Sequence, residues 1–308
     1  MVNVPTESIQ RPLSLQIGDQ IGIISTARKI SEEELEFAKS LFSNWGLKVV
    51  FGDHLFCKFH QFAGTDTQRA ADLQSMIDDP EIKAIMCARG GYGTVRILDR
   101  INFTSLQKNP KWIGGFSDVT ALHSSVHNIG IPSLHCSMPI NFSNNSEDSL
   151  ESLKKALLGQ KLSYQFPKHP LNRKGKTEGK VIGGNLSILY SLIGSKSDIN
   201  TDNKILFLED LDEYLYHIDR MMMNLKRNGK LSKLAGLIVG SMSDMNDNAI
   251  PFGKTAVEII AETVAEYNYP VAFNFPAGHL DNNNTLVLGE CASLVVENTS
   301  TLCYGKTS

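Results

Sequence analysis

Apolar positions in the first half of the chain follow two alternating periods. Short apolar runs that end in Ser, Thr or Gly predict strands at 20–26, 48–56 and 82–91, from Trp112, and at 131–136. Between them, apolar residues at helical spacing predict helices over 31–46, 65–79 and 94–101 and from Ser117 onward. This alternation predicts a doubly wound, mostly parallel α/β sheet, whose sites lie at the carboxyl ends of the strands.

The second half is also α/β in pattern but is richer in strands. The sequence is polar and irregular between residues 141 and 180, which is typical of a linker between domains. Beyond it the pattern predicts a strand, acidic turn and helix over 205–229, a strand at 234–244, a helix at 254–268, a strand at 270–279 and a hairpin at 285–297. We therefore predict a first domain over 1–150, a linker over 151–178 and a smaller C-terminal domain over 179–308.

Composition narrows the classes of partner. With 308 residues, 42% of them hydrophobic, the chain can form two packed cores. The net charge is −3 and no basic run is present, so nothing favours nucleic acid or an anionic membrane, and a small molecule or peptide is the expected substrate. The five cysteines form no C-x-x-C pair, and no signal peptide or long apolar span is evident, so we expect a reduced, cytoplasmic protein.

The stretch WIGGFSDVTALH places Ser117 and Asp118 at the start of a predicted helix. Both residue types are common N-caps, since their oxygens accept the free N–H groups of the first turn. Alternatively, Gly114 and Gly115 form a tight strand-to-helix turn that exposes the Ser117 hydroxyl near the positive end of the helix, as a nucleophile is presented. Val119 replaces the last glycine of the strict G-x-S-x-G elbow, so this stretch leaves both interpretations open.

Two strand ends in the second half carry groups that would complete a nucleophilic site. Glu209 precedes Asp210 at the end of one strand, and His279 follows Gly278 at the end of another. A histidine can take a serine's proton while a carboxylate fixes its tautomer. Each also has an ordinary interpretation, because an acidic turn favours the positive end of the next helix and a histidine after glycine is often a solvated loop residue.

The segment ARGGYG, residues 88–93, follows a predicted strand and is rich in glycine. It fits neither G-x-G-x-x-G nor G-x-x-x-x-G-K-[ST], so a nucleotide site is not favoured. It is either a plain turn or an oxyanion hole, in which backbone N–H groups around Gly90 and Gly91 face developing negative charge.

One competing arrangement is metal-binding. Glu213 and His217 are four residues apart on a predicted helix, which places both side chains on one face. No second histidine completes H-E-x-x-H, and exposed Glu–His pairs at this spacing are common. We therefore expect no metal and no cofactor.

Together these segments resemble the LD-carboxypeptidase family of serine peptidases. The resemblance rests on five blocks in the family's order: ARGGYGTVRILDRI, GGFSDVTALH, VIGGNLSILYSLIGS, LFLEDLDEYLYHIDRMMMNL and PAGHLDNNNTLVLGE. The blocks run from about residue 20 to residue 290, nearly the whole chain. The resemblance implies a two-domain enzyme with a Ser-Glu-His triad, whose serine comes from the first domain and whose other two members come from the second.

Carried over by position, the resemblance assigns Ser117 as nucleophile, His279 as base and Glu209 as the carboxylate. Glu213 lies one helical turn away and is the alternative acid; Glu209 is preferred because it closes a strand. The oxyanion donors correspond to the backbone amides of Gly91 and Asp118. A carboxypeptidase must also bind a terminal carboxylate, for which Arg89 or a nearby cluster of amides is the candidate.

The family resemblance also implies a substrate. Its members remove the terminal D-alanine from murein tetrapeptides in cytoplasmic peptidoglycan recycling, often as homodimers, and a sister branch cleaves the peptide-nucleotide microcin C. The segment EDLDEYLYHIDRM is more similar to the murein branch. Two rivals from other classes are a non-catalytic two-lobed protein that binds a peptide or sugar, with Ser117 as a helix cap, and a metal-dependent amidase built on Glu213 and His217.

Overall fold

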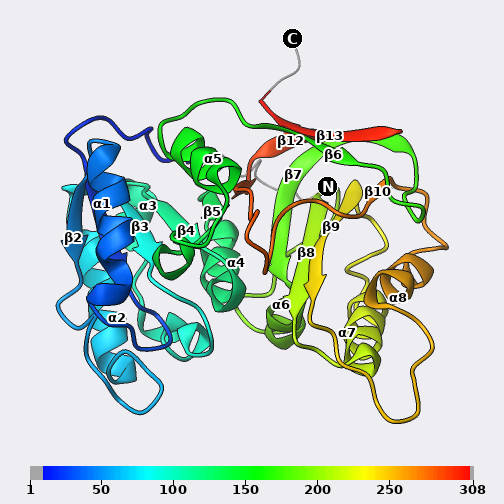
Figure 1. Ribbon diagram of the computed structural model, residues 1–308, viewed down its shortest axis with the longest axis horizontal. Helices are drawn as coiled ribbons and strands as arrows, with labels where there is room; N and C mark the ends of the chain where they lie inside the picture. Colours follow the sequence, from blue (N-terminus) through cyan, green and yellow to red (C-terminus); the bar gives the residue numbers. More distant parts are fainter. Residues whose placement is uncertain (1–9, 306–308) are drawn as a thin grey trace, which may run out of the picture.

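The computed structural model describes residues 10–305 and places two β-sheets side by side, each covered by helices (Figure 1). The first sheet has six strands in the order β11-β5-β4-β3-β1-β2, and the second has seven in the order β10-β9-β8-β7-β12-β13-β6. This mixed α/β architecture, with a mostly parallel first sheet and a strand-rich second one, confirms the predicted fold class.

The first sheet is parallel except at one edge. Five strands run parallel: β1 Gln20–Ile24, β2 Lys48–Phe51, β3 Ile82–Cys87, β4 Trp112–Gly115 and β5 Ser133–His135. The sixth, β11 (Leu286–Leu288), pairs antiparallel with β5, although it comes from the far end of the chain. Parallel strands bring their carboxyl ends to one edge, and the segments that follow β1, β3 and β4 meet there.

The second sheet combines parallel and antiparallel parts. Its parallel strands are β7 Gly175–Asn185, β8 Ile205–Leu211, β9 Gly236–Ser243 and β10 Val271–Ala272. The antiparallel strands are β12 Cys291–Val296, β13 Thr299–Tyr304 and β6 Ser163–Pro167. They cross the top of the molecule in Figure 1.

The helices begin where the sequence provides capping groups. Thr65 and Gln68 form a reciprocal capping box at the start of α2, and Thr255 and Glu258 form another at α8. The first five α-helices are α1 Glu36–Asn44, α2 Asp66–Asp78, α3 Thr104–Lys108, α4 Thr120–Asn128 and α5 Glu147–Leu157. Those beside the second sheet are α6 Leu186–Leu192, α7 Leu215–Arg227 and α8 Ala256–Thr263. None of the helices in residues 10–305 has the length and apolar character needed to cross a bilayer.

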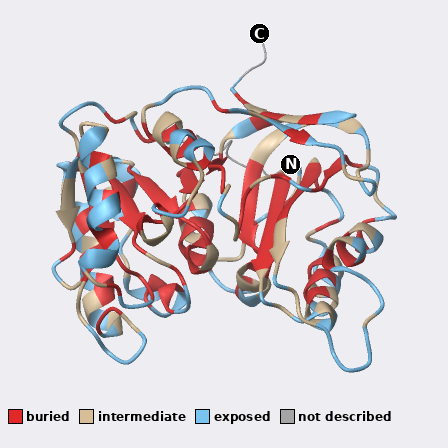
Figure 2. Ribbon diagram, viewed as in Figure 1, coloured by how far each residue is buried: buried red, intermediate tan, exposed pale blue. Residues whose placement is uncertain are grey.

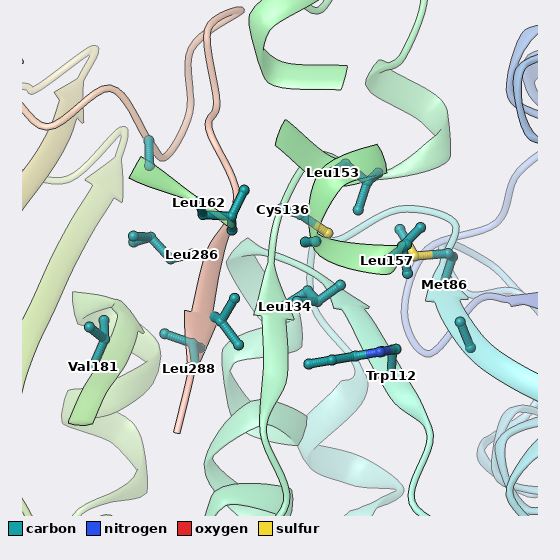
Figure 3. Close-up of a cluster of buried hydrophobic side chains, with 14 of the residues drawn as sticks. Met86, Trp112, Leu134, Cys136, Leu153, Leu157, Leu162, Val181, Leu286 and Leu288 are labelled. Atoms are coloured by element: carbon teal, nitrogen blue, oxygen red, sulfur yellow. The ribbon is translucent and has the colours of Figure 1, made fainter. Parts of the chain in front are cut away.

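One apolar core is shared by the two sheets. Trp112 of β4 and Val181 of β7 belong to the same cluster of buried side chains, and Leu288 of β11 lies between them in the close-up of Figure 3. The central strands of both sheets are buried along most of their length (Figure 2). Burying a leucine contributes roughly 2 kcal/mol, so this shared core holds the two halves of the chain in a fixed relation.

Three predicted elements differ from the structure. Segment 94–101 forms two 3₁₀ turns, Thr94–Arg96 and Leu98–Arg100, not an α-helix, because Thr94 is held by tertiary hydrogen bonds that its apolar pattern does not encode. The predicted strand 270–279 is regular only at β10, and its remainder follows β9 through isolated hydrogen bonds.

The third difference is the hairpin expected at 285–297. Its two strands do not pair with each other: β11 joins β5, whereas β12 joins β7 and β13. Gly289, with a φ of +92°, turns the chain from the first sheet to the second, and its N–H donates to Val181 at 2.7 Å. Alternating polarity predicts strands but does not determine which strands pair with each other.

The polar passage is also more regular than expected. The segment contains α5, which buries its Leu153 face, the edge strand β6, and the first residues of β7. The proposed linker 151–178 thus crosses from the first sheet to the second while forming secondary structure of its own.

Candidate active site

A cavity of about 540 Å³ lies where the two halves of the chain meet. Its walls come from the segments after β1, β3 and β4 on one side and from the end of β8 on the other. Ser117 and His279 both line it, so the structure brings two distant site residues predicted from the sequence to one cavity.

Ser117 occupies a strained turn. It follows β4, begins the 3₁₀ turn Ser117–Val119 that leads into α4, and has a φ of +61°, a conformation that non-glycine residues rarely adopt. Gly115 makes the turn possible, because a Cβ there would lie 2.9 Å from the Val119 side chain. The Ser117 side chain caps no helix and forms no hydrogen bond with another residue in 10–305, so the capping interpretation is wrong.

The glycine turn after β3 passes directly beside this hydroxyl. A Cβ on Gly90 would lie 3.3 Å from Ser117 Oγ, which is a tight contact, so glycine lets the turn pass beside this hydroxyl without crowding it. The buried Asp118 carboxylate fixes the turn by accepting the Thr94 backbone N–H at 2.8 Å, while burial raises the pKa of that carboxyl. Gly91, with a φ of +113°, lines the cavity with Ser117.

Glu209 and His279 form a hydrogen-bonded pair on the opposite wall. Glu209 Oε2 lies 2.7 Å from His279 Nδ1, and the Glu209 side chain is fully buried. Its second oxygen, Oε1, has no hydrogen-bond partner in residues 10–305. Gly278 permits the contact, because a Cβ there would lie 2.9 Å from Glu209 Oε2.

The environment of His279 favours its charged form. Burial lowers the pKa of the imidazole, but the hydrogen bond that it donates to Glu209 and the charges of Glu209 and Asp210 outweigh burial, so the pKa is raised above its ordinary 6.5. A carboxylate on Nδ1 directs Nε2 to accept a proton, as a general base requires. Within residues 10–305 no hydrogen bond joins this imidazole to Ser117, and the Phe116 ring lies 4.8 Å from the imidazole between ring centroids.

Asp210 is a site residue that the sequence analysis treated only as part of an acidic turn. It lines the cavity, is almost fully buried, and accepts hydrogen bonds from Asn185 Nδ2 at 2.9 Å and from the Ser187 N–H at 2.8 Å. Burial, with the nearby charge of Glu209, raises its pKa to about 7. Its position directly after Glu209 at a strand end was the available signal.

Arg28 was missed altogether. It follows β1 and lines the cavity beside Gly91. The rule that sites gather at the carboxyl ends of parallel strands applies to β1 as much as to β3 and β4, and it would have selected this segment. Arg89, which the sequence predicted, also lines the cavity.

The competing pair, Glu213 and His217, is also hydrogen-bonded. Glu213 Oε2 lies 2.6 Å from His217 Nδ1. The expected placement of both residues on one helix is wrong, because α7 begins at Leu215 after the N-cap Tyr214, so Glu213 reaches His217 from the segment before the helix. In residues 10–305 no group of three or more His, Cys, Asp or Glu side chains is arranged to hold a metal ion.

Both halves of the chain match the same family of known proteins. Residues 21–136 match the model of the LD-carboxypeptidase N-terminal domain, and residues 178–294 match that of the C-terminal domain. The chain is 34% identical to a probable murein peptide carboxypeptidase of Bacillus subtilis, over 92% of this chain and 91% of that one. It is 28% identical to a murein tetrapeptide carboxypeptidase of Pseudomonas aeruginosa, over 90% and 94%.

Solved structures agree in fold. A muramoyltetrapeptide carboxypeptidase from Oxalobacter formigenes superposes with a TM-score of 0.86 at 25% identity, covering 93% of this chain and 99% of that one. The protein MccF in complex with glutamyl sulfamoyl guanosine superposes with a TM-score of 0.85 at 22% identity, covering 96% and 98%.

Proposed function

This chain belongs to the LD-carboxypeptidase family, and we propose that it is a serine carboxypeptidase that releases the terminal D-alanine from murein tetrapeptides. The observation that carries the proposal is the buried Glu209–His279 hydrogen bond, 2.7 Å long, which opens on the cavity that Ser117 also lines. The bond cleaved is the L-to-D peptide bond before that D-alanine.

The reaction is acyl transfer. His279 takes the proton from the Ser117 hydroxyl as the oxygen attacks the scissile carbonyl, and Glu209 holds the imidazole and stabilises its charge. The backbone N–H groups of Gly91 and Asp118 donate to the oxyanion, which suits the turn that places Gly90 beside Ser117. The imidazolium then protonates the leaving amine of D-alanine. Water, deprotonated by the same imidazole, then attacks the acyl carbonyl, the bond to Ser117 Oγ breaks, and the imidazolium returns the proton to Oγ.

The positive φ of Ser117 supports this role. A serine that neither caps the helix nor bonds to another described side chain has no structural reason for a strained backbone. A nucleophilic serine does have a reason for this conformation, since the turn presents its hydroxyl to the cavity near the start of α4. The non-catalytic alternative expects Ser117 as a cap and no histidine nearby, so it loses its main supporting arguments.

The test is D-alanine release from a murein tetrapeptide, measured by mass spectrometry. We expect Ser117→Ala and His279→Ala each to lower kcat by at least ~10⁴-fold. Ser191→Ala is the matched control, because this exposed serine on α6 bonds only to its own helix and should retain wild-type kcat. Substantial activity in either active-site variant would overturn the proposal.

A second candidate is cleavage of a microcin C-type peptide-nucleotide. The observation in its favour is the superposition with MccF, a structure titled as a complex with glutamyl sulfamoyl guanosine. Assaying an aminoacyl sulfamoyl nucleoside beside the tetrapeptide separates the two, and we expect the tetrapeptide to have the higher kcat/KM.

We further propose that the catalytic serine belongs to a domain over 1–150 and that Glu209 and His279 belong to one over 179–308, joined through 151–178. We also propose that the enzyme acts in the cytoplasm as a homodimer. Sedimentation equilibrium of the purified chain tests the dimer, and a monomer at micromolar concentration would exclude it.

A further inference from the structure

A carboxypeptidase of the proposed kind must bind the free carboxylate at the end of its substrate. Two arginines line the cavity on the side of the first sheet, Arg28 and Arg89. The following inference rests on the proposed function and concerns which of the two performs this task.

The Arg89 guanidinium already has partners. Its Nη1 donates to the Lys29 carbonyl at 3.2 Å and lies 3.9 Å from a carboxylate oxygen of Glu34. Binding a substrate carboxylate there would compete with an anion that belongs to the protein.

The Arg28 side chain lies across Gly91. A Cβ on Gly91 would come within 2.7 Å of Arg28 Cγ and Nε, so the absence of a side chain at Gly91 provides the space for this arginine. Within residues 10–305 the Arg28 guanidinium forms neither a hydrogen bond nor an ion pair. Its five N–H donors are therefore available to a ligand in the cavity.

The geometry of a peptide connects this arginine to the reaction. Three covalent bonds separate the scissile carbonyl carbon from the carboxylate carbon of the leaving D-alanine, so these atoms lie at most about 4 Å apart. If the scissile oxygen accepts from the Gly91 N–H, the carboxylate lies within reach of a side chain that packs on Gly91. We propose that Arg28 binds the terminal carboxylate of the substrate and thereby restricts cleavage to the last residue.

The opposite wall of the cavity favours the same orientation. Asp212 and Glu213 line that side and repel an anion, as Asp210 does above its raised pKa of about 7, whereas Arg28 attracts one. The substrate then lies with its carboxylate end toward β1 and β3 and the rest of the peptide toward β8.

The experiment measures binding without turnover. In a Ser117→Ala background, calorimetry compares a murein tetrapeptide with the same peptide ending in a carboxamide. We expect the free acid to bind about 10- to 100-fold more tightly, as a charge-assisted bidentate contact provides. Adding Arg28→Gln should bring this ratio close to one, and Arg28→Lys should retain part of it, since an ammonium keeps the charge but loses the fork. Adding Arg89→Gln should leave the ratio within about threefold of its starting value.

Each outcome decides the question. An unchanged ratio in Arg28→Gln, a ratio lost in Arg89→Gln, or equal or undetectable binding of acid and amide with both arginines present would overturn the inference. Circular dichroism and thermal unfolding verify that each variant folds. D-alanine release by the wild type is measured separately, so its absence beside an intact binding preference would overturn the proposed function and leave only the binding of the carboxylate by Arg28 standing.

Discussion

Two Glu–His pairs of nearly identical geometry occupy different environments in this protein. The buried pair joins Glu209 to His279 at 2.7 Å, and the surface pair joins Glu213 to His217 at 2.6 Å. The Glu209 side chain is 0% exposed and His279 is 15% exposed, whereas the side chains of the surface pair are 23% and 28% exposed. Contact distance alone therefore does not distinguish the surface pair from the pair that we propose to be catalytic.

Burial and position do distinguish them. Water reaches and screens the surface pair, so its contribution to stability is small. The buried pair is screened far less, and it raises the pKa of an imidazole that faces the cavity. The surface pair joins the segment just before α7 to the first turn of that helix, so its members are four residues apart. The buried pair joins β8 to a segment 70 residues later and exists only once the second sheet has formed.

The strongest test of the difference between the two pairs replaces each glutamate in turn by glutamine. Glu209→Gln removes the charge that orients and stabilises the imidazolium, and we expect kcat to fall by ~10³–10⁴-fold. Glu213→Gln also changes a cavity wall, so we expect a less than ~10-fold effect, mainly on KM. Steady-state hydrolysis of the tetrapeptide measures both. The reverse ranking would make Glu213 the triad acid, the alternative that the sequence left open.

The second test changes the backbone beneath the buried pair. Gly278 has a φ of +116°, and a Cβ there would collide with Ser241 and lie 2.9 Å from Glu209 Oε2. Gly253→Ala is the matched control, because its φ is +84° but its Cβ would meet nothing within 4 Å. We expect Gly253→Ala to cost about 1 kcal/mol of unfolding free energy for the strained backbone alone.

Gly278→Ala should cost a further 1–3 kcal/mol, from overpacking, and lower kcat by roughly 10²-fold as the imidazole is displaced. Urea unfolding and hydrolysis rates measure the two effects. If both alanine variants lose equal stability and Gly278→Ala keeps its kcat, the close packing around Glu209 is unimportant for the site.

The pH dependence of activity further distinguishes the buried pair from the surface pair. His279 must be neutral to accept a proton, and its pKa is raised, so kcat/KM should fall as pH drops through a midpoint above 6.5. Glu209→Gln should lower that midpoint, whereas Glu213→Gln should leave it in place. Asp210, whose pKa is raised to about 7, titrates in the same range, and Asp210→Asn separates the two groups. A wild-type midpoint below 6.5 would contradict this account.

Stability should vary with pH in the same window. A raised pKa in the folded state means that the folded protein holds its proton more tightly than the unfolded chain does. The contribution of His279 is therefore fully present below about pH 6.5 and is lost as pH rises through its folded pKa. Urea unfolding of wild type and His279→Gln between pH 5 and pH 9 measures it, and a difference that grows with pH would have the wrong sign.

The sequence predicts those parts of the site that depend on local pattern. Ser117, Glu209 and His279 each lie at the end of an apolar run, which marks them as strand-end residues. Ser117 belongs to the first sheet and the other two to the second, so their meeting at one cavity depends on the packing of the two sheets, which the alternation does not predict. The resemblance to the family adds their roles. Local pattern brings the members of the surface pair close in sequence, but the helix that was expected to carry both begins only at Leu215, after Glu213.

What the sequence does not predict depends on contacts between distant segments. Arg28 belongs to no recognisable motif, and its position matters only because the glycine turn at Gly91 folds beneath it. The pairing of β11 with β5 is likewise a choice of partner, which periodicity leaves open. The strained φ of Ser117, which decides against capping, becomes visible only in the folded backbone.

The smallest expected effect concerns His217, the histidine of the surface pair. His217→Asn removes an i, i+4 interaction whose members are partly exposed, so we expect less than about 0.5 kcal/mol of destabilisation in urea unfolding. Because His217 does not line the cavity, kcat should stay within twofold of wild type, and EDTA should leave both proteins active. Inactivation by EDTA, together with a large loss of activity in His217→Asn, would instead favour a metal-dependent amidase built on this pair. The two glutamates would then exchange roles, and burial would no longer mark the catalytic one.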